Sequence, residues 1–250
     1  MWSKNMFIKS ISAKSDQGPY LNVNEDTHHI DLDKKLFQIY DGFGGSGVGD
    51  VVVNKLKNEI NQNYAQIAKD PDSTLPFFFS AKYLIEGNAL INAAINSNSS
   101  LFKENVAKTI NQKAGASGVL MVQNENLFTV FSTGNCAVFL LRNGKLKPVT
   151  ISDHYGFLTG DDGNSHLKTC PMSGFGMFSD LHFQVKEVRL YEKDILVALT
   201  DGAYSRLSQA EIGDIVGRRD SLIPERIDCL FSLANSRGNL DNQTALFIEY

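Results

Sequence analysis

Three short segments near the N-terminus have the hydrophobic pattern of strands. Residues 6–12 alternate apolar and polar side chains, and residues 27–30 and 36–40 form two further short β-like runs. The run at 36–40 is nearly all apolar, as expected for a strand that is buried on both faces. Residues 14–20 are polar and contain a Gly-Pro pair, which predicts a loop.

The next part of the chain has apolar residues at helical spacing. This spacing predicts a helix over 49–68 and a second helix over 75–96. Residues 96–100, Asn-Ser-Asn-Ser-Ser, predict a linker, and 101–110 predict a shorter third helix. The apolar positions of the first helix are Val52, Leu56, Ile60, Tyr64 and Ile67.

The remainder of the chain returns to strand-like patterns and then ends with a helix pair and one strand. Strands are predicted at 117–122, 127–132, 137–142, 145–149, 183–190, 195–200 and 244–250, and helices at 208–216 and 224–235. Asn143-Gly144 is a hairpin signal between two of these strands. Residues 151–180 are polar and glycine-rich, so we expect a long surface loop that borders a site.

This order of elements determines the expected fold class. Two long helices, a series of antiparallel strands and a late helix pair indicate an α+β fold, because a parallel α/β fold would alternate strand and helix. The 250 residues are within the range of one large sandwich or barrel, and 42% of them are hydrophobic. We therefore expect one domain over residues 1–250.

Composition excludes several classes of function. A formal net charge of -4 argues against a dedicated nucleic-acid binder, which usually carries a basic stripe. No stretch reaches the roughly 18 apolar residues of a membrane span. Residues 1–11 lack the apolar core of a signal peptide, so we expect a cytoplasmic protein. Export by a route that leaves the N-terminus uncut is also compatible with the sequence, and a monomer is the default expectation.

The three cysteines suggest neither a zinc site nor a disulfide framework. Cys136, Cys170 and Cys229 are odd in number, widely spaced, and form no C-x-x-C motif. We expect buried free thiols in a reducing compartment.

Carboxylates stand beside several of the predicted strands. Asn24-Glu25-Asp26 precedes the second strand, and Asp41 ends the third, directly before a glycine-rich turn. Asp201 and Asp241 repeat this position at a strand end and a strand start. Alone, each could be a solvated loop or a tight turn. Together they indicate a site for a hard divalent cation, because oxygen ligands suit Mg²⁺ and Mn²⁺ and an unneutralised carboxylate cluster would repel itself.

These residues also carry a resemblance to a known family. N-E-D at 24–26, D-G-F-G-G at 41–45, T-D-G at 200–202 and D-N-Q-T at 241–244 resemble the signature blocks of the metal-dependent protein phosphatases, the type 2C serine/threonine phosphatases. Their order and spacing resemble a compact bacterial member, and weaker similarity fills the middle of the chain.

The resemblance implies a fold and an activity. The expected fold is an α-β-β-α sandwich of two antiparallel sheets flanked by helices, with residues 151–180 as a flap-like region. The expected activity is hydrolysis of phosphoserine and phosphothreonine in a phosphoprotein substrate, by a metal-activated water at a binuclear Mn²⁺ or Mg²⁺ centre. A nucleotide-binding interpretation of residues 42–49 is weaker, because the G-K-[ST] lysine is missing.

The resemblance also assigns roles to individual residues. It implies that Asp41 bridges the two ions and that Asp26 holds a metal-bound water, which makes these two the catalytic residues. The implied metal ligands are Glu25, Asp41 and the carbonyl of Gly42, with Asp201 and Asp241 on the second ion.

Four positions depart from the family pattern. Leu21 replaces an arginine that grips the substrate phosphate, and leucine cannot make that bidentate contact. Lys14, His28 or His29 could substitute for it, or could be ordinary surface residues. Phe43 stands where the family has histidine, a replacement that bacterial relatives tolerate.

The other two departures affect an additional metal site. Asn135 and Ser205 stand at family aspartates that support a third, weaker ion beside Asp201. We therefore expect two ions and a lost third site. Together with Leu21, these two departures motivate an alternative function, a catalytically weak or inactive phosphatase-fold protein that binds metal or a phosphorylated partner.

Overall fold

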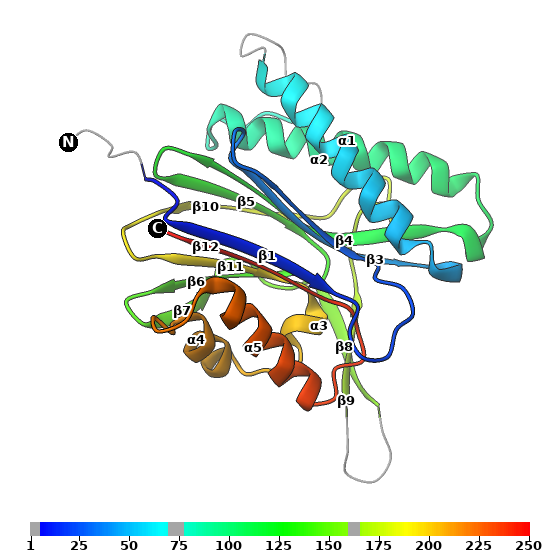
Figure 1. Cartoon of the computed structure of the whole chain (residues 1–250). Coiled ribbons are helices and arrows are strands. Elements are labelled where there is room, and N and C mark those ends of the chain that lie inside the picture. Colours follow the sequence, from blue (N-terminus) through cyan, green and yellow to red (C-terminus); the bar gives the residue numbers. More distant parts are fainter. Residues whose placement is uncertain (1–5, 70–77, 160–165) are drawn as a thin grey trace.

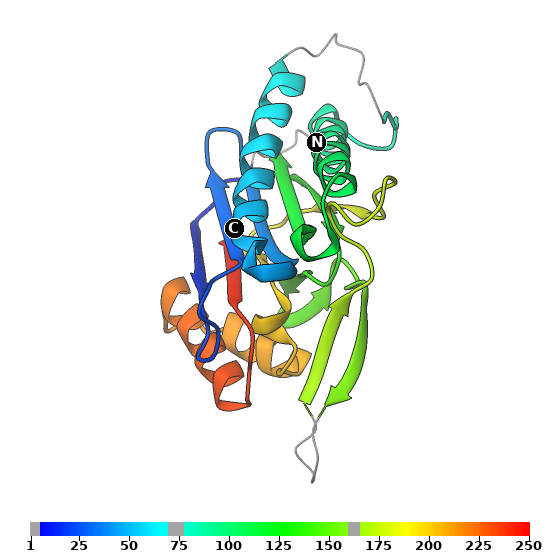
Figure 2. The same ribbon diagram turned by 90° about the vertical axis from the view of Figure 1, so that its right-hand side faces the viewer.

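The protein folds into two stacked β-sheets with helices on both outer faces. The structure is a computed structural model that describes residues 6–69, 78–159 and 166–250 (Figure 1). Figure 2 shows the sheets side by side, with one helix layer against each. Both five-stranded sheets are antiparallel throughout. The predicted α-β-β-α sandwich is therefore confirmed.

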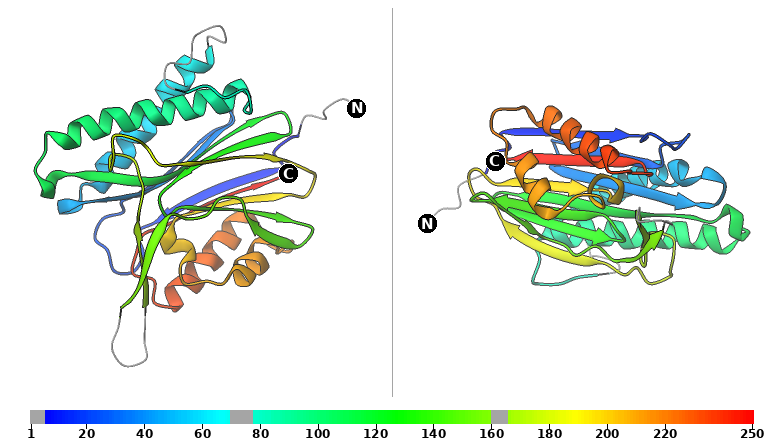
Figure 3. Two further views of the ribbon diagram at one scale, coloured as in Figure 1. Left: turned by 180° about the vertical axis from the view of Figure 1, so that it is seen from behind. Right: turned by 90° about the horizontal axis from the view of Figure 1, so that it is seen from below.

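The first sheet joins the two ends of the described chain. Its order is β1-β12-β11-β6-β7. The strands are β1 (Ser10–Asp16), β12 (Gln243–Glu249), β11 (Ile195–Leu199), β6 (Ala137–Arg142) and β7 (Lys145–Pro148). Helices α3 (Asp201–Tyr204), α4 (Gln209–Val216) and α5 (Ile223–Ser236) lie on the same side of the molecule as this sheet (Figures 1 and 3).

The second sheet is built mainly from the first half of the chain. Its order is β10-β5-β4-β3-β2. The strands are β10 (Gln184–Arg189), β5 (Leu127–Thr133), β4 (Ala114–Asn124), β3 (Leu36–Gly44) and β2 (Asp26–Asp31). Helices α1 (Gly49–Lys69) and α2 (Ile85–Val106) cover it, and two short 3₁₀ turns, η1 (Gly45–Gly47) and η2 (Ile110–Gln112), lie near them.

Three apolar cores hold the four layers together. One fills the space between the sheets, where Phe37 and Phe128 stack with ring centroids 5.8 Å apart. The other two cores lie between each sheet and its own helices. Alternate residues of each strand thus serve different cores, which fixes the register.

The N-terminal strand begins and ends later than its pattern predicts. Residues 6–9 precede β1, and residues 14–16, which we predicted as loop, pair with β12. The reason is tertiary: Ile11 and Ala13 pack against the core between the sheets, and the β12 backbone supplies the hydrogen-bond partners. The polar residues of this strand are compatible with it because only one face is buried.

The predicted linker at 96–100 and the separate helix at 101–110 are both wrong. Helix α2 runs through them without a break and ends at Val106. Ser97 accepts a hydrogen bond from Asn63 Nδ2 at 3.1 Å, and Asn98 Nδ2 donates to the carbonyl of Phe178 at 3.1 Å. These tertiary partners stabilise polar residues inside the helix. Of the predicted helix start, residues 75–77 lie outside the described residues, and 78–84 are not helical.

The region at 151–180 is more ordered than the long loop we predicted. It contains the hairpin of β8 (His154–Thr159) and β9 (His166–Pro171), which pair as a separate two-stranded sheet. Figure 3 shows that this hairpin extends away from the body of the sandwich. Among the described residues, every helix is too short or too polar to cross a membrane.

Candidate metal centre

Four aspartates meet at one end of the sandwich, and both sheets contribute. Asp26 is the first residue of β2 and lies directly opposite Asp41 of β3 in the strand register. Asp201 follows β11 as the first residue of α3, and Asp241 lies two residues before β12. Within each sheet the two positions lie at the same end, because β11 and β12 are antiparallel neighbours, as are β2 and β3. The hydrogen bond from Thr200 to Asp26 brings these two ends together.

Asp26 links the two sheets. It is buried, and Thr200 Oγ1 donates a hydrogen bond to its Oδ2 at 2.8 Å. The same hydroxyl accepts the backbone N–H of Thr244 at 2.8 Å. Burial raises the pKa of Asp26 well above its usual range. The threonine hydrogen bonds lower it in part, and the charges of Asp241 and Asp201 raise it further.

Asp41 and Asp201 are in direct contact. Burial raises the pKa of both carboxyl groups, and the pKa of Asp201 reaches about 6. After burial, the charges of Asp201, Asp26 and Asp241 raise the pKa of Asp41, and that of Asp241 raises the pKa of Asp201. The two carboxyl groups therefore influence each other's pKa directly. Two buried carboxylates that are in contact repel each other when both are ionised, and a bound cation would relieve this repulsion.

Two neutral side chains orient Asp201. Asn135 Nδ2 donates to Asp201 Oδ2 at 2.8 Å, and Thr169 Oγ1 of β9 donates to the same oxygen. Asn135 is itself held, because the Tyr204 hydroxyl donates to its carbonyl at 2.6 Å. Asn135 Oδ1 is buried and has no hydrogen-bond partner within the described ranges. Thr169 thus connects the hairpin to the site, a contact that no sequence motif indicated.

Glu25 is adjacent to this cluster, but its carboxylate is directed to α1. Its backbone carbonyl accepts the N–H of Gly42 at 3.1 Å, while its Oε1 accepts the N–H of Gly49 at 2.7 Å. Gly49 begins α1, where free N–H groups and the helix dipole favour a negative charge. A Cβ at Gly42 would lie 2.7 Å from the Glu25 carbonyl, so glycine permits this close approach.

Asn242 connects the loop before β2 to the loop before β12. Its Oδ1 accepts the N–H of Glu25 at 2.9 Å, and its Nδ2 donates to the carbonyl of Gln17 at 2.7 Å. Gly202 makes room for the Asn242 backbone, because a Cβ there would lie only 1.9 Å from the Asn242 oxygen. Asn242 belongs to the D-N-Q-T block that carries the family resemblance, but only the structure shows that it joins these two loops.

The acidic side chains are grouped but not arranged as closed ligand shells. Within the described part of the chain, no set of three or more Asp, Glu, His or Cys side chains is spaced to hold an ion. Instead the aspartates contact one another and the hydroxyl and amide donors of Thr169, Thr200 and Asn135. The assignment of Glu25, Asp41, Gly42, Asp201 and Asp241 as metal ligands therefore stays a prediction.

The residues that could replace the missing arginine are engaged elsewhere or partly buried. Leu21 is exposed, and Lys14 Nζ donates to Asp228 on α5 at 2.7 Å. His28 and His29 are half-buried within β2. Burial lowers the pKa of both histidines, so they are biased toward the neutral form.

Phe43 packs against the backbone of two glycines. The ring of Phe43 packs over Gly115 and Gly174, where an added Cβ would lie 2.6 and 3.1 Å from it.

All three cysteines are free, as predicted. Cys136 is buried, but Cys170 on β9 is exposed, so the predicted burial is wrong for that thiol.

Comparisons with known proteins agree with the fold and with the motifs. No family model matches the chain. The serine/threonine phosphatase stp of Listeria welshimeri is 23% identical over 252 residues, covering 94% of each chain. The serine/threonine phosphatase of S. agalactiae has a TM-score of 0.78 at 19% identity, over 96% of this chain and 98% of the other. The catalytic domain of the serine/threonine phosphatase PstP, solved with 2 manganese ions, has a TM-score of 0.68 at 18% identity, over 96% and 97%. The predicted resemblance to bacterial serine/threonine phosphatases is confirmed.

Proposed function

We propose that this chain, a relative of the bacterial type 2C serine/threonine phosphatases, is a metal-dependent enzyme that hydrolyses phosphoserine and phosphothreonine in a phosphoprotein substrate. The observation that carries the proposal is the group of four aspartates that both sheets direct to one end of the sandwich. Their mutual repulsion requires a cation, and oxygen donors suit Mg²⁺ or Mn²⁺.

The oxygen chemistry of this donor set suits two such ions. We assign Asp41 to both ions, Glu25 and the Gly42 carbonyl to one, and Asp201 with Asp241 to the other. When bound, two ions would supply a water nucleophile activated near neutral pH and positive charge for the phosphoryl oxygens.

The side chains of this protein would orient the reacting groups. Thr200 fixes one oxygen of Asp26, which sets the direction in which this carboxylate would hold a water. Asn135 and Thr169 fix one oxygen of Asp201, which limits how that ligand can turn. Because Thr169 lies on β9, the position of the hairpin is tied to the order of the site.

We further propose that the third ion of the family is absent here. Asn135 donates a hydrogen bond to Asp201 where a carboxylate would add charge, and Ser205 is also neutral. Calorimetric titration with Mn²⁺ should therefore give two ions per chain. The Asn135→Asp/Ser205→Asp double variant should bind a third ion, and three ions in the native protein would contradict the proposal.

The main test is metal-dependent turnover. Hydrolysis of p-nitrophenyl phosphate and of a phosphothreonine peptide should require Mn²⁺ or Mg²⁺ and stop in EDTA. Asp41→Asn should reduce kcat by roughly 10³-fold or more, since it removes the group assigned to both ions. Asp33→Asn, in an exposed turn, is the matched control and should leave kcat unchanged. Turnover in EDTA, or an active Asp41→Asn variant, would rule out the proposed function.

A second candidate is a phosphatase-fold protein that binds metal or a phosphorylated partner with little turnover. It is favoured by Leu21 and by the engagement of Lys14 with Asp228, which leave the phosphate grip without its arginine. This function predicts Mn²⁺ binding by calorimetry without phosphate release from phosphopeptides. Leu21→Arg should then raise kcat/KM, whereas rapid turnover by the native chain would exclude this candidate.

We also propose that residues 1–250 form one domain, with 151–180 as its flap, and that the protein acts as a cytoplasmic monomer. The shared core between the sheets supports one domain. Three free thiols support a reducing compartment. Sedimentation of the purified protein would check the monomer.

A further inference from the structure

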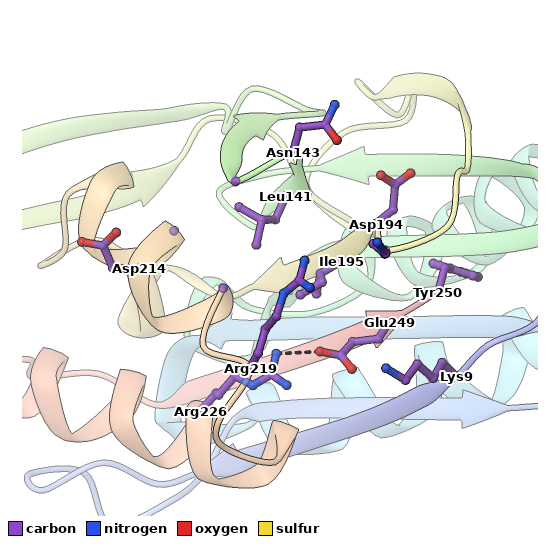
Figure 4. Close-up of a pocket in the computed structure, with 14 residues that line it drawn as sticks. Lys9, Leu141, Asn143, Asp194, Ile195, Asp214, Arg219, Arg226, Glu249 and Tyr250 are labelled. Carbon is purple, nitrogen blue, oxygen red and sulfur yellow. Dashed lines mark hydrogen bonds and ion pairs between the residues drawn. The ribbon is translucent and has the colours of Figure 1, made fainter.

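The opposite end of β11 and β12 contains a cavity of about 490 Å³, which we name the strand-end pocket. Ile195, the first residue of β11, and Glu249, the last residue of β12, both line it (Figure 4). Asp201 lies six residues after Ile195, so at ~3.3 Å per strand residue the pocket is about 20 Å from the aspartates. The strand-end pocket is therefore separate from the candidate metal centre.

A buried arginine has a fixed orientation in this pocket. Arg226 of α5 is only 6% exposed. Its Nε donates to the Ser221 carbonyl at 3.0 Å, and its Nη1 donates to the Val216 carbonyl at 2.9 Å and to Glu249 at 2.6 Å. Figure 4 shows this side chain beside Glu249 in the pocket. The guanidinium is thus pre-organised, which reduces the entropy cost of binding a ligand to it.

The two buried or half-buried acids of the pocket already have cationic partners. Asp194 accepts hydrogen bonds from Arg142 Nε at 2.9 Å and Nη2 at 2.6 Å. Glu249 is paired with Arg226. Neither carboxylate is therefore available to neutralise the other cations that line the pocket.

Three further cations face the pocket without such partners. Lys9, Lys193 and Arg219 line it and are exposed, and among the described residues none of the three makes an ion pair. Asp214 is the remaining acid of the lining. With the Arg226–Glu249 and Arg142–Asp194 pairs counted as neutral, the side chains of the lining have a surplus of positive charge, although the whole chain has a formal net charge of -4. A concave surface with one sign of charge attracts ligands of the opposite sign.

Part of the lining is apolar and has room for an organic group. Leu141 and Ile195 contribute apolar side chains, and Gly213 and Gly217 contribute only backbone. The volume is within the roughly 300–1,000 Å³ that is typical of small-molecule sites. An apolar wall with a few convergent charged groups is also the usual composition of such sites.

We propose that the strand-end pocket binds a small organic molecule that carries a phosphate monoester. A phosphate monoester has nearly two negative charges and three acceptor oxygens, which suit the cationic donors of Arg219, Lys193 and Arg226 in the lining. The organic part would lie against Leu141 and Ile195. This site takes no part in the proposed hydrolysis, and it stands whether or not the chain is an active phosphatase.

The test is calorimetric titration of the full chain with adenosine 5′-monophosphate and glucose 6-phosphate, in Mn²⁺ and again in EDTA. At least one probe should bind with similar affinity in both buffers, because none of the residues that we assign to the metal ions lines the pocket. Adenosine, which lacks the phosphate, should bind at least tenfold more weakly than its monophosphate. Binding that requires Mn²⁺ would locate the probe at the metal centre and overturn the proposal, as would failure of both probes to bind.

Variants locate the binding. Lys193→Gln/Arg219→Gln should weaken the phosphate probe about 100-fold, roughly tenfold for each charge-assisted contact. Arg219→Glu alone should weaken it at least as much as the Arg219→Gln change. Arg218→Gln is the matched control, because Arg218 is the neighbouring arginine and its Nη1 contacts Cys229 Sγ instead. Unchanged affinity in the double variant, or equal loss in the control, would overturn the proposal.

Discussion

The two ends of β11 and β12 treat buried charge in opposite ways. At one end, Asp26, Asp41 and Asp201 lie within reach of one another's charge, and the pKa of each is raised, first by burial and then by its acidic neighbours. At the other end, Asp194 and Glu249 each bind an arginine of the same chain. The carboxylates at both ends are enclosed by protein, but only at the pocket end do arginines of the same chain neutralise them.

This difference distinguishes carboxylates that stabilise the fold from carboxylates that are available to bind a cation. A buried carboxylate needs a partner, because its desolvation costs several kcal/mol when it is left alone. The pocket end meets that need within the fold. The aspartate end meets it only in part, through hydroxyl and amide donors, so a divalent cation from solution would complete it. Removal of charge should therefore have opposite effects on stability at the two ends.

The largest effect is expected for Arg226→Met at the pocket end. It leaves Glu249 half-buried without its cation, so the free energy of unfolding in urea should fall by about 3–5 kcal/mol. Lys14→Met is the control, because the Lys14–Asp228 pair is exposed and should contribute less than about 1 kcal/mol. Equal losses in both variants would show that the buried pair has no special role.

Gly202→Ala should have the next largest effect, at the aspartate end. The new Cβ would lie 1.9 Å from the Asn242 oxygen, so the backbone must move, at a cost of about 2–3 kcal/mol. Mn²⁺ affinity should fall with it, because Asp201 and Asp241 are the neighbours of these residues. The control is Gly144→Ala at the pocket end, which has open space but a φ of +72° and should cost about 1 kcal/mol. Calorimetry and thermal unfolding measure both quantities, and an unchanged Mn²⁺ affinity in Gly202→Ala would contradict this prediction.

The smallest effect should have the opposite sign. In EDTA, Asp41→Asn should raise the free energy of unfolding by about 1–2 kcal/mol, because it removes one of the repelling charges and its amide can donate to Asp201. In saturating Mn²⁺ the native protein should gain more stability than the variant, since binding stabilises the folded state. Asp33→Asn should change neither value. A less stable Asp41→Asn protein in EDTA would show that repulsion does not dominate at this end.

The sequence predicted the fold well where local pattern and tertiary structure agree. The apolar run before Asp41 and the one before Asp201 each form a buried strand. The predicted end of the first is wrong, because β3 continues past Asp41 to Gly44, while β11 ends at Leu199, just before Asp201. The pattern was misleading where long-range partners decide. From the sequence alone Asn98 resembles a linker residue, but in the structure its side chain donates a hydrogen bond to the carbonyl of Phe178, which is 80 residues away in the chain.

The candidate site was predictable only in part for a similar reason. Acidic residues at strand ends are visible in the sequence, and the structure brings four of the aspartates together. Thr169 could not be found, because it lies in a polar region without periodicity and meets Asp201 only through the hairpin. The direction of the Glu25 carboxylate, toward the N-terminus of α1, also depends on the packing of α1 against the second sheet.

The exposed thiol of Cys170 is a natural site at which the β8–β9 hairpin can be labelled. It follows Thr169, the residue that contacts Asp201, while Cys136 is buried, with a pKa raised by burial, and Cys229 is half-buried. A maleimide dye should therefore react first at Cys170, without any engineered cysteine. The fluorescence of such a conjugate would report, in real time, whether the hairpin changes position as the acidic end takes up its ions.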